Sequence, residues 1–371
     1  MSNIKSPYRY DHVGSFLRPE ELKQARRDFK AGKVSREELT ATEDKAITAL
    51  VEKQKKAGFH IITDGEYRRE FWHLDFMWGF EGVAHENTGS GVQFSGELAA
   101  LDDTYLVGKI KAAPHPFVEY FKFLKQFEDE QTVAKYTIPA PAQTFQQMIV
   151  PQNIEQTRKF YSTNEELIQD IGAAYQAVIK QFYEAGCRDL QLDDCTWGAV
   201  VGDAAKQRYE SLGIDIEDVK KQLLEVNNLA LANKPADMVI TSHICRGNYH
   251  STYFTSGPYD SVADYVFAHE NVDALLLEYD DERSGGFEPL AKVSPDKKVV
   301  LGLITSKTPE LEDKQAVIAR IHEAAKFIPL ERLCLSPQCG FASCEIGNKL
   351  TEQEQWAKLA LVKEIAEEVW R

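Results

Sequence analysis

The chain has 371 residues, and its 58 Asp and Glu outnumber its 43 Lys and Arg, giving a net charge of −15. This acidic excess argues against nucleic acid or an anionic membrane surface as a partner. No apolar run approaches the roughly 20 residues of a membrane-spanning helix, and the N-terminus carries no hydrophobic secretion segment.

The six cysteines are sparse and form no Cys-x-x-Cys pair. This usage favours reduced thiols in a cytoplasmic protein over disulfides. A chain of this length is compatible with one large barrel domain spanning residues 1–371.

The N-terminal part of the chain alternates predicted strands and helices. Tyr8–Ser15 is predicted as the first strand, and a helix follows from Pro19. A longer helix is predicted from Ser35 to Ala57, with Ser35 and Glu38 spaced as a capping box. Phe59–Thr63 is predicted as the second strand.

Residues 80–112 interrupt this alternation, because they are rich in glycine and carry alternating apolar positions. They are predicted to form a β-hairpin excursion from the main fold.

The alternation then resumes to the end of the chain. The further strands are predicted at Lys135–Pro139, Arg188–Asp193, Ala236–Ile240 with its extension to Cys245, Val272–Glu278, Lys298–Leu303 and Arg332–Leu335. The further helices are predicted at Asn164–Ala185, Ile216–Asn233, Pro309–Phe327 and Thr351–Trp370. Eight strand–helix units of this kind predict an α/β fold in which a parallel sheet closes into a (β/α)8 TIM barrel.

Four residues of metal-ligand type lie at or just beyond the ends of three predicted strands. His243 and Cys245 are two apart, so in an extended chain their side chains point to the same side. Glu278 ends another strand, and Cys339 follows a third. The carboxyl ends of barrel strands are where barrel active sites lie, and imidazole and thiolate ligands suit zinc. Each residue taken alone is equally compatible with a core pair, a rim carboxylate or a loop cysteine.

The pattern His243-x-Cys245, Glu278 and Pro337-x-Cys339-Gly340 resembles the zinc signature of the cobalamin-independent methionine synthases. The resemblance extends to Val13–Phe16, Asp64–Glu66 and Leu190–Asp194, in the same order along the chain. It is greatest to the single-barrel members of that superfamily, which lack the N-terminal half of the full-length enzymes.

The resemblance implies a zinc-dependent S-methyltransferase that converts homocysteine to methionine, with zinc held by His243, Cys245, Glu278 and Cys339. It also implies that Ser15 holds the carboxylate of homocysteine, while Glu66 and Asp193 hold its ammonium group. Asp194 is the alternative to Asp193 for this role, because strand alternation turns the side chain of only one of the two inward.

The departures from the full-length synthases lie on the side of the methyl donor. Lys307 stands near the position of a family histidine that assists proton movement, so Lys307 is either a candidate catalytic acid or anion-binding residue, or a solvated lysine at the rim. Trp197 is either a stacking partner for a flat donor or a core residue. The loop from Arg246 to Tyr259 is long enough to act as a lid. The donor therefore stays open between a methylfolate and a methylated corrinoid protein.

Three other interpretations are compatible with the same residues. The first is a zinc alkyltransferase acting on a different thiol, such as coenzyme M. The second is a metal-free barrel resembling uroporphyrinogen decarboxylase, which requires arginines at the mouth; the candidates are Arg18, Arg68, Arg69, Arg246 and Arg283. The third is a barrel that stores zinc or acts as a scaffold without catalysis.

Overall fold

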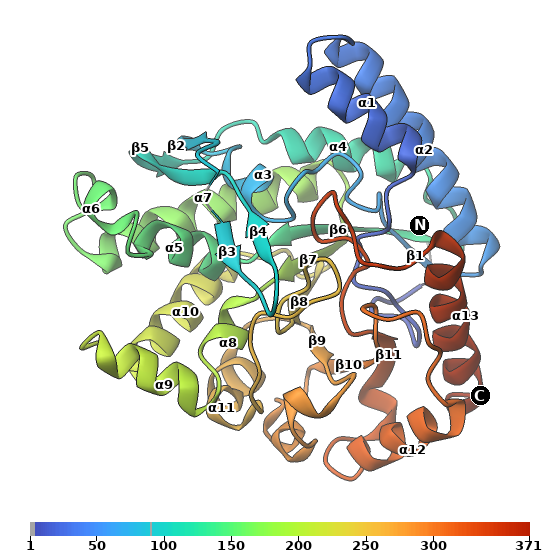
Figure 1. Cartoon of the computed structure of the whole chain (residues 1–371). Coiled ribbons are helices and arrows are strands. Elements are labelled where there is room, and N and C mark those ends of the chain that lie inside the picture. Colours follow the sequence, from blue (N-terminus) through green and yellow to red (C-terminus); the bar gives the residue numbers. More distant parts are fainter. Residues whose placement is uncertain (1–3, 90) are drawn as a thin grey trace.

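A parallel sheet of seven strands curls around the centre of the molecule in the computed structural model, which describes residues 4–89 and 91–371 (Figure 1). The order of the strands across the sheet is β1-β6-β7-β8-β9-β10-β11, and every neighbouring pair is parallel. Their bounds are β1 Ile61–Ile62, β6 Val133–Pro139, β7 Asp189–Asp193, β8 Val239–Ile244, β9 Ala274–Glu278, β10 Lys298–Ile304 and β11 Leu333–Pro337. The TIM-barrel-like fold predicted from the alternation of strands and helices is confirmed.

The segment predicted as the first strand occupies the gap between β11 and β1, but it is not a regular strand. It makes one isolated parallel bridge at Tyr10 to Leu335 and another at Ser15 to Gly65. Between the two bridges Gly14 adopts a φ of 141°, where a side chain would lie 2.8 Å from the methyl group of Thr137. The prediction of a continuous strand was wrong because the segment leaves one neighbour to reach the other, and glycine permits the change of direction.

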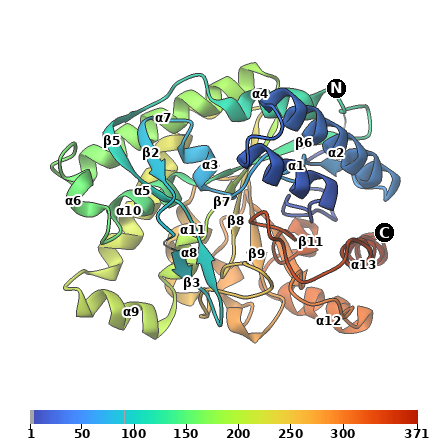
Figure 2. The same cartoon turned by 45° about the horizontal axis from the view of Figure 1, so that its top comes forward.

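Helices surround the sheet on its outer side (Figures 1 and 2). The longer ones are α1 Glu20–Lys30, α2 Arg36–Lys56, α4 Pro116–Lys125, α5 Pro141–Ile149, α7 Asn164–Glu184, α9 Gly202–Ser211, α10 Ile216–Leu231, α11 Asp260–His269, α12 Lys314–Ala324 and α13 Glu352–Val369. The single-turn helices are α3 Leu74–Met77, α6 Ile154–Thr157 and α8 Thr196–Ala199. No helix within the described ranges is both long enough and apolar enough to pass through a membrane.

Local capping explains where several of these helices begin. Ser35 and Glu38 form the predicted capping box of α2, and Thr351 and Glu354 form the same motif at α13. The helix predicted from Pro309 begins at Lys314 instead, because the side chain of Asp313 accepts from the amide of Ala316 and caps it there.

The excursion between residues 80 and 112 consists of two antiparallel ribbons, one nested inside the other. The outer ribbon pairs β2, Glu81–Glu86, with β5, Asp103–Lys111. The inner ribbon pairs β3, Gly91–Gln93, with β4, Leu98–Ala100. The predicted hairpin is confirmed, and the inner ribbon extends across the mouth of the curled sheet (Figures 1 and 2).

Alternation along the strands divides the core into two parts. Leu275 and Leu277 of β9 join the main cluster between sheet and helices. Leu276 instead packs with Val13, Val300 and Cys334 in a smaller cluster. Because Glu278 is two residues beyond Leu276, the same alternation directs it to the inner side of the strand end.

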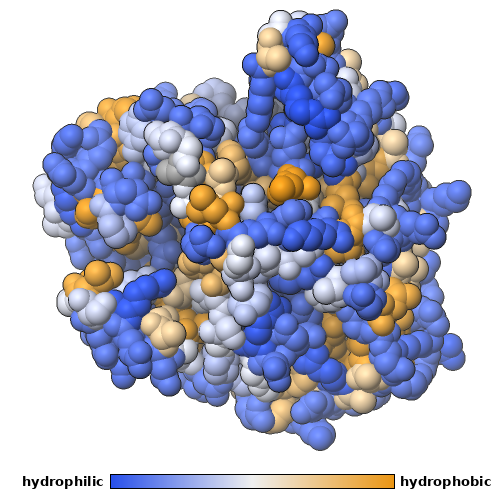
Figure 3. All heavy atoms as spheres, in the orientation of Figure 1, coloured by the Kyte–Doolittle hydropathy of each residue, from blue (hydrophilic) through white to orange (hydrophobic). Residues whose placement is uncertain are grey.

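The face seen in Figure 3 is largely hydrophilic, with hydrophobic side chains in smaller patches.

Candidate metal and substrate site

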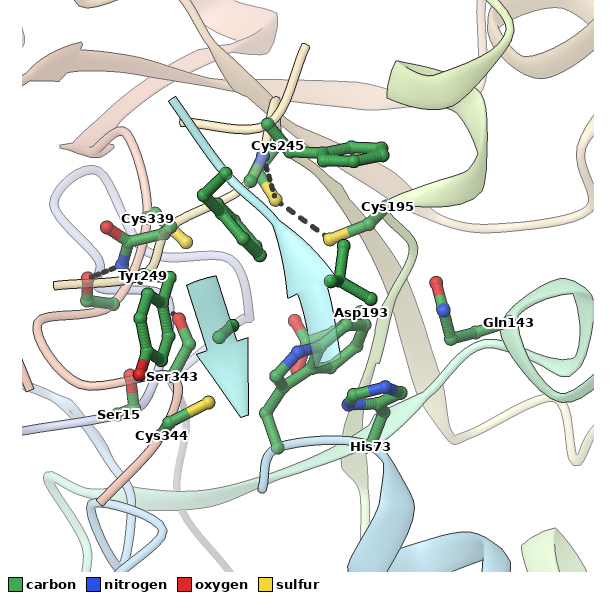
Figure 4. A pocket seen from close by; sticks show the side chains of 18 of the residues that line it. Ser15, His73, Gln143, Asp193, Cys195, Cys245, Tyr249, Cys339, Ser343 and Cys344 are labelled. Atoms are coloured by element: carbon green, nitrogen blue, oxygen red, sulfur yellow. Dashed lines mark hydrogen bonds between the residues drawn. The ribbon is translucent and has the colours of Figure 1, made fainter. Parts of the chain in front are cut away.

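A pocket of about 250 Å³ opens at the carboxyl ends of the sheet strands, beneath the inner ribbon. Its floor is formed by residues from strand ends that are far apart in the sequence, and its walls come from the inner ribbon, α5 and the loop after β8. The predicted site residues that line it are Ser15, Glu66, Asp193, His243, Cys245 and Cys339. Figure 4 labels four of them, Ser15, Asp193, Cys245 and Cys339. Active sites of parallel barrels lie at this same end of the strands.

Three of the predicted metal ligands converge at one side of this pocket. His243 lies on β8, Cys245 follows that strand, and Cys339 follows β11. Their ligand atoms all lie within 4.8 Å of one another, and each residue is buried. The Nε2 atom of His243 is 3.4 Å from the Sγ atom of Cys339.

A fourth sulfur, from Cys195, lies beside this group. Its Sγ atom is 3.1 Å from that of Cys245 (Figure 4). Asp193 of β7 pairs in register with His243 of β8, and each cysteine stands two residues further along its own chain segment. Hydrogen bonding from Cys195, and then from Cys339, holds the pKa of the Cys245 thiol well below its usual range.

The donor set fits zinc. Two thiols and one imidazole are soft and borderline ligands, and a low thiol pKa favours the thiolate that coordinates metal. The Nδ1 atom of His243 has no hydrogen-bond partner among the described residues, although it is buried.

Glu278 lies outside this group of three. One of its carboxylate oxygens accepts from the backbone amide of Arg246 at 2.9 Å. The other is 3.3 Å from the guanidinium of Arg283. The structure therefore brings together three of the four predicted ligands and directs the fourth toward these two arginines.

Lys307 is buried and does not line the pocket. Its Nζ atom has no hydrogen-bond partner in the described part of the chain. Burial disfavours its charge, but the carboxylates of Glu278 and Asp280 outweigh this effect and raise the pKa of Lys307.

The two carboxylates predicted to bind an ammonium group face the pocket. Glu66 has a φ of 61° and accepts from the hydroxyl of Thr137 at 2.9 Å. Such a backbone conformation is uncommon for a residue other than glycine and is often found at functional sites. The Oε1 atom of Glu66 is 3.5 Å from Arg69. Asp193 accepts from the side-chain amide of Gln191 at 2.7 Å, and burial raises the pKa of Asp193 to about 7.

Several other candidates lie away from the pocket. Asp194 accepts from Asn227 and from the amide of Thr196, both at 2.9 Å, so its carboxylate is used within the fold. Trp197 is fully buried and packs toward Tyr265, as a core residue does. None of the five arginines proposed for a decarboxylase lines the pocket.

Sequence reasoning missed several pocket residues: Trp72, His73, Phe94, Gln143, Cys195 and Cys344. Cys195 had a usable signal, because it follows a predicted strand end just as Cys245 does. The aromatic residues had no such sequence signal, since only the packing of the inner ribbon brings Phe94 to the mouth of the pocket.

A buried group of sulfur and imidazole atoms at the mouth of a curled parallel sheet, with two carboxylates beside it, defines a barrel protein with a candidate metal site. Comparison with known proteins specifies this class further. The model of the family described as "Cobalamin-independent synthase, Catalytic domain" matches residues 11–368, and the chain belongs to this family.

Individual relatives span the same length. YxjH of Bacillus subtilis, an uncharacterised protein, is 45% identical over 99% of this chain and 96% of its own. A methionine synthase of Saccharolobus solfataricus is 26% identical over 97% of this chain and 95% of its own. Among solved structures, a putative vitamin-B12 independent methionine synthase of Listeria monocytogenes is 38% identical, with a TM-score of 0.78 and complete coverage of both chains.

Proposed function

We propose that this protein is a zinc-dependent methyltransferase that transfers a methyl group to the sulfur of homocysteine and forms methionine. The observation that carries the proposal is the convergence of His243, Cys245 and Cys339 within 4.8 Å, in a pocket shared with Glu66 and Asp193. Membership of the cobalamin-independent synthase family supports the same reaction.

His243, Cys245 and Cys339 are the residues that would hold zinc, and Glu278 is the proposed fourth ligand. Bound zinc would lower the pKa of an incoming thiol from roughly 8.5, which supplies a sulfur nucleophile at neutral pH. For Glu278 to join the other three, its carboxylate has to leave the amide of Arg246 and the side chain of Arg283.

Glu66 and Asp193 would bind the ammonium group of homocysteine. Thr137 and Gln191 orient the two carboxylates by hydrogen bonds of 2.9 and 2.7 Å. Ser15 is proposed to hold the substrate carboxylate, and its Oγ atom already faces the amide of Ala342 at 3.3 Å. Lys307 is proposed to act as a proton donor or anion ligand from its buried position beside Glu278.

The acidic pair favours homocysteine over a thiol that carries only a sulfonate, such as coenzyme M, because such a thiol has no ammonium group. A pocket lined by no arginine among the described residues also disfavours decarboxylation of a polycarboxylate. Methylfolate and a methylated corrinoid protein are the two donors that the sequence suggests.

Metal analysis of protein purified under reducing conditions tests the proposal, together with Cys339→Ser. We expect about one zinc per chain in the wild type, weak zinc binding in Cys339→Ser, and methionine formation only by the wild type. Cys334→Ser is the matched control, since Cys334 is a buried thiol of the small inner cluster, away from the pocket. A metal-free wild type and an active Cys339→Ser variant would contradict the proposal.

A further inference from the structure

Part of the pocket that contains the sulfur group is lined by aromatic side chains, and we call this part the aromatic compartment. Its aromatic side chains come from the segment before α3, the inner ribbon and the loop after β8, and they are Trp72, Phe94, Tyr249 and Phe254. The ring of Phe94 is 5.4 Å from that of Tyr249 and 5.6 Å from that of Phe254, between ring centres. Aliphatic residues and the amides of Gln143, Gln146 and Gln147 complete the walls.

Apart from His243, the proposed metal ligand, the described lining residues offer a ligand no cationic side chain. Among the described residues that line the pocket there is no lysine and no arginine. The other histidine, His73, is buried, and burial lowers the pKa of His73 to about 3, so this imidazole is neutral at physiological pH. Glu66 lies in the same pocket, but the proposed function assigns it to the ammonium group of homocysteine. The lining therefore gives an anionic donor no lysine or arginine partner, while its aromatic faces suit a cation.

The compartment is also small and covered. The whole pocket measures about 250 Å³, and homocysteine must share it with the donor. Sites for drug-sized ligands are usually larger than this. The inner ribbon closes the pocket from above, since the amide of Ser95 donates to the carbonyl of Tyr253 at 2.9 Å. The carboxylate of Glu97 also lies 2.6 Å from the Nδ1 atom of His250 and forms an ion pair of 2.6 Å with Lys349. A ligand enclosed here has to be compact.

We propose that this aromatic compartment binds the methyl donor, and that the donor is a small methylated cation of the sulfonium or quaternary ammonium class. Aromatic faces attract such cations through their ring quadrupoles, and methylated cations fill aromatic cages without needing hydrogen bonds. This inference rests on the proposed function for the acceptor, and it replaces the folate or corrinoid donor by a different class.

The chemistry of such a donor balances within the site. The homocysteine sulfur forms a bond to the methyl carbon while the bond from that carbon to the donor sulfur breaks. The donor sulfur keeps the electron pair and leaves as a neutral thioether, and the thiol proton is released to solvent. With trimethylsulfonium the products are methionine, dimethyl sulfide and one proton. The leaving group needs no proton.

Binding of tetramethylammonium, an unreactive probe, tests the compartment separately from catalysis. Calorimetry on the zinc-loaded protein is expected to show that tetramethylammonium binds at least about tenfold more tightly than neopentyl alcohol, a water-soluble neutral molecule with a similar branched carbon skeleton. Phe94→Leu removes the ring face and keeps an apolar side chain, so this preference is expected to fall about tenfold. Phe123→Leu, on α4 and outside the pocket, is the matched control.

Trp72→Leu provides a second variant in case the inner ribbon depends on Phe94. Trp72 is anchored through its backbone amide, which donates to the carbonyl of Ser343 at 3.0 Å, and this bond survives the substitution. Equal binding of the cation and the neutral analogue, or a preference unchanged in both variants, would overturn the inference.

A turnover assay separates this inference from the proposed function. Homocysteine is supplied with trimethylsulfonium, methyltetrahydrofolate bearing one or three glutamates, or methylcobalamin, and dimethyl sulfide and methionine are measured. Methionine from trimethylsulfonium supports both proposals. Methionine from a folate or corrinoid, without selective cation binding, keeps the proposed function and rejects the cation donor. Selective cation binding without methionine from any donor keeps the cation site and rejects the proposed function.

Discussion

The sulfur atoms of Cys195 and Cys245 lie 3.1 Å apart at the end of two adjacent parallel strands. Asp193 and His243, each two residues before one of these cysteines, are paired in register, so the pairing of the two strands brings the cysteines close together. A short movement of the two side chains would bring the sulfur atoms to the length of a disulfide bond, about 2.05 Å. One of the proposed zinc ligands therefore has a second thiol within reach of its sulfur atom.

Oxidation of the zinc-free protein is expected to join these two cysteines. Each thiol loses a proton and an electron, and hydrogen peroxide is reduced to two water molecules. Peptide mapping by mass spectrometry should find a Cys195–Cys245 disulfide, together with loss of zinc rebinding. The Cys195→Ser variant should keep more of its zinc-binding capacity after the same treatment. Cys344→Ser, another pocket cysteine, should behave as the wild type, and equal losses in all three proteins would contradict this expectation.

The neighbouring residues Asp193 and Asp194 are expected to respond differently to the same substitution. Asp193→Asn removes a charge from the pocket and should raise KM for homocysteine by about 10-fold to 100-fold, since hydrogen bonds to charged groups contribute roughly 1.5–3 kcal/mol. Its thermal stability should change little.

Asp194→Asn should instead lower the melting temperature, because Asn227 and Thr196 lose a charged acceptor. Steady-state kinetics and thermal unfolding of both variants show which of the two carboxylates binds the substrate and which stabilises the fold. A larger KM effect in Asp194→Asn than in Asp193→Asn would reverse the assignment of the inward carboxylate.

Glu270 makes the stability of the protein depend on pH. Burial, followed by the charge of Asp194, raises the pKa of Glu270 to about 8 from an ordinary value of 4.5. The folded state thus holds a proton that the unfolded state releases, so this contribution to stability is complete below about pH 4.5 and is lost as the pH rises through about 8.

Glu270→Gln mimics the protonated side chain and can keep the hydrogen bond from Asn227, which measures 2.9 Å. Its free energy of unfolding relative to the wild type should increase between about pH 5 and 8, by on the order of 3 kcal/mol, and then level off. Denaturant unfolding at several pH values measures this difference. Glu225→Gln, at an exposed position of α10, should show no such trend.

Leu276 supports the inside of the barrel, where it packs with Val13, Val300 and Cys334. Leu276→Ala should leave a cavity and cost about 2–5 kcal/mol of unfolding free energy. Leu311 has a side chain that is 54% exposed. Leu311→Ala should therefore cost much less. Chemical denaturation of the two variants tests the contrast, and equal losses would show that the inner cluster is loosely packed.

Much of the fold could be predicted from local patterns. The capping residues around Ser35 and Thr351 lie within one turn of the helices they begin, so a short stretch of chain contains the whole signal. The apolar runs of β9 and β10 similarly indicate buried parallel strands. The spacing of His243 and Cys245 is also local, because alternation along a strand places both side chains on one side.

The sequence by itself determined the barrel, the family signature and the residue types of the candidate site. Only the tertiary structure decided which of those residues meet: Cys195 joins the sulfur group, Asp193 rather than Asp194 faces the pocket, and Glu278 is directed to Arg246 and Arg283. It also decided that the inner ribbon covers the mouth of the pocket. These contacts join segments far apart in the sequence, and they depend on strand register and packing, which no local pattern encodes.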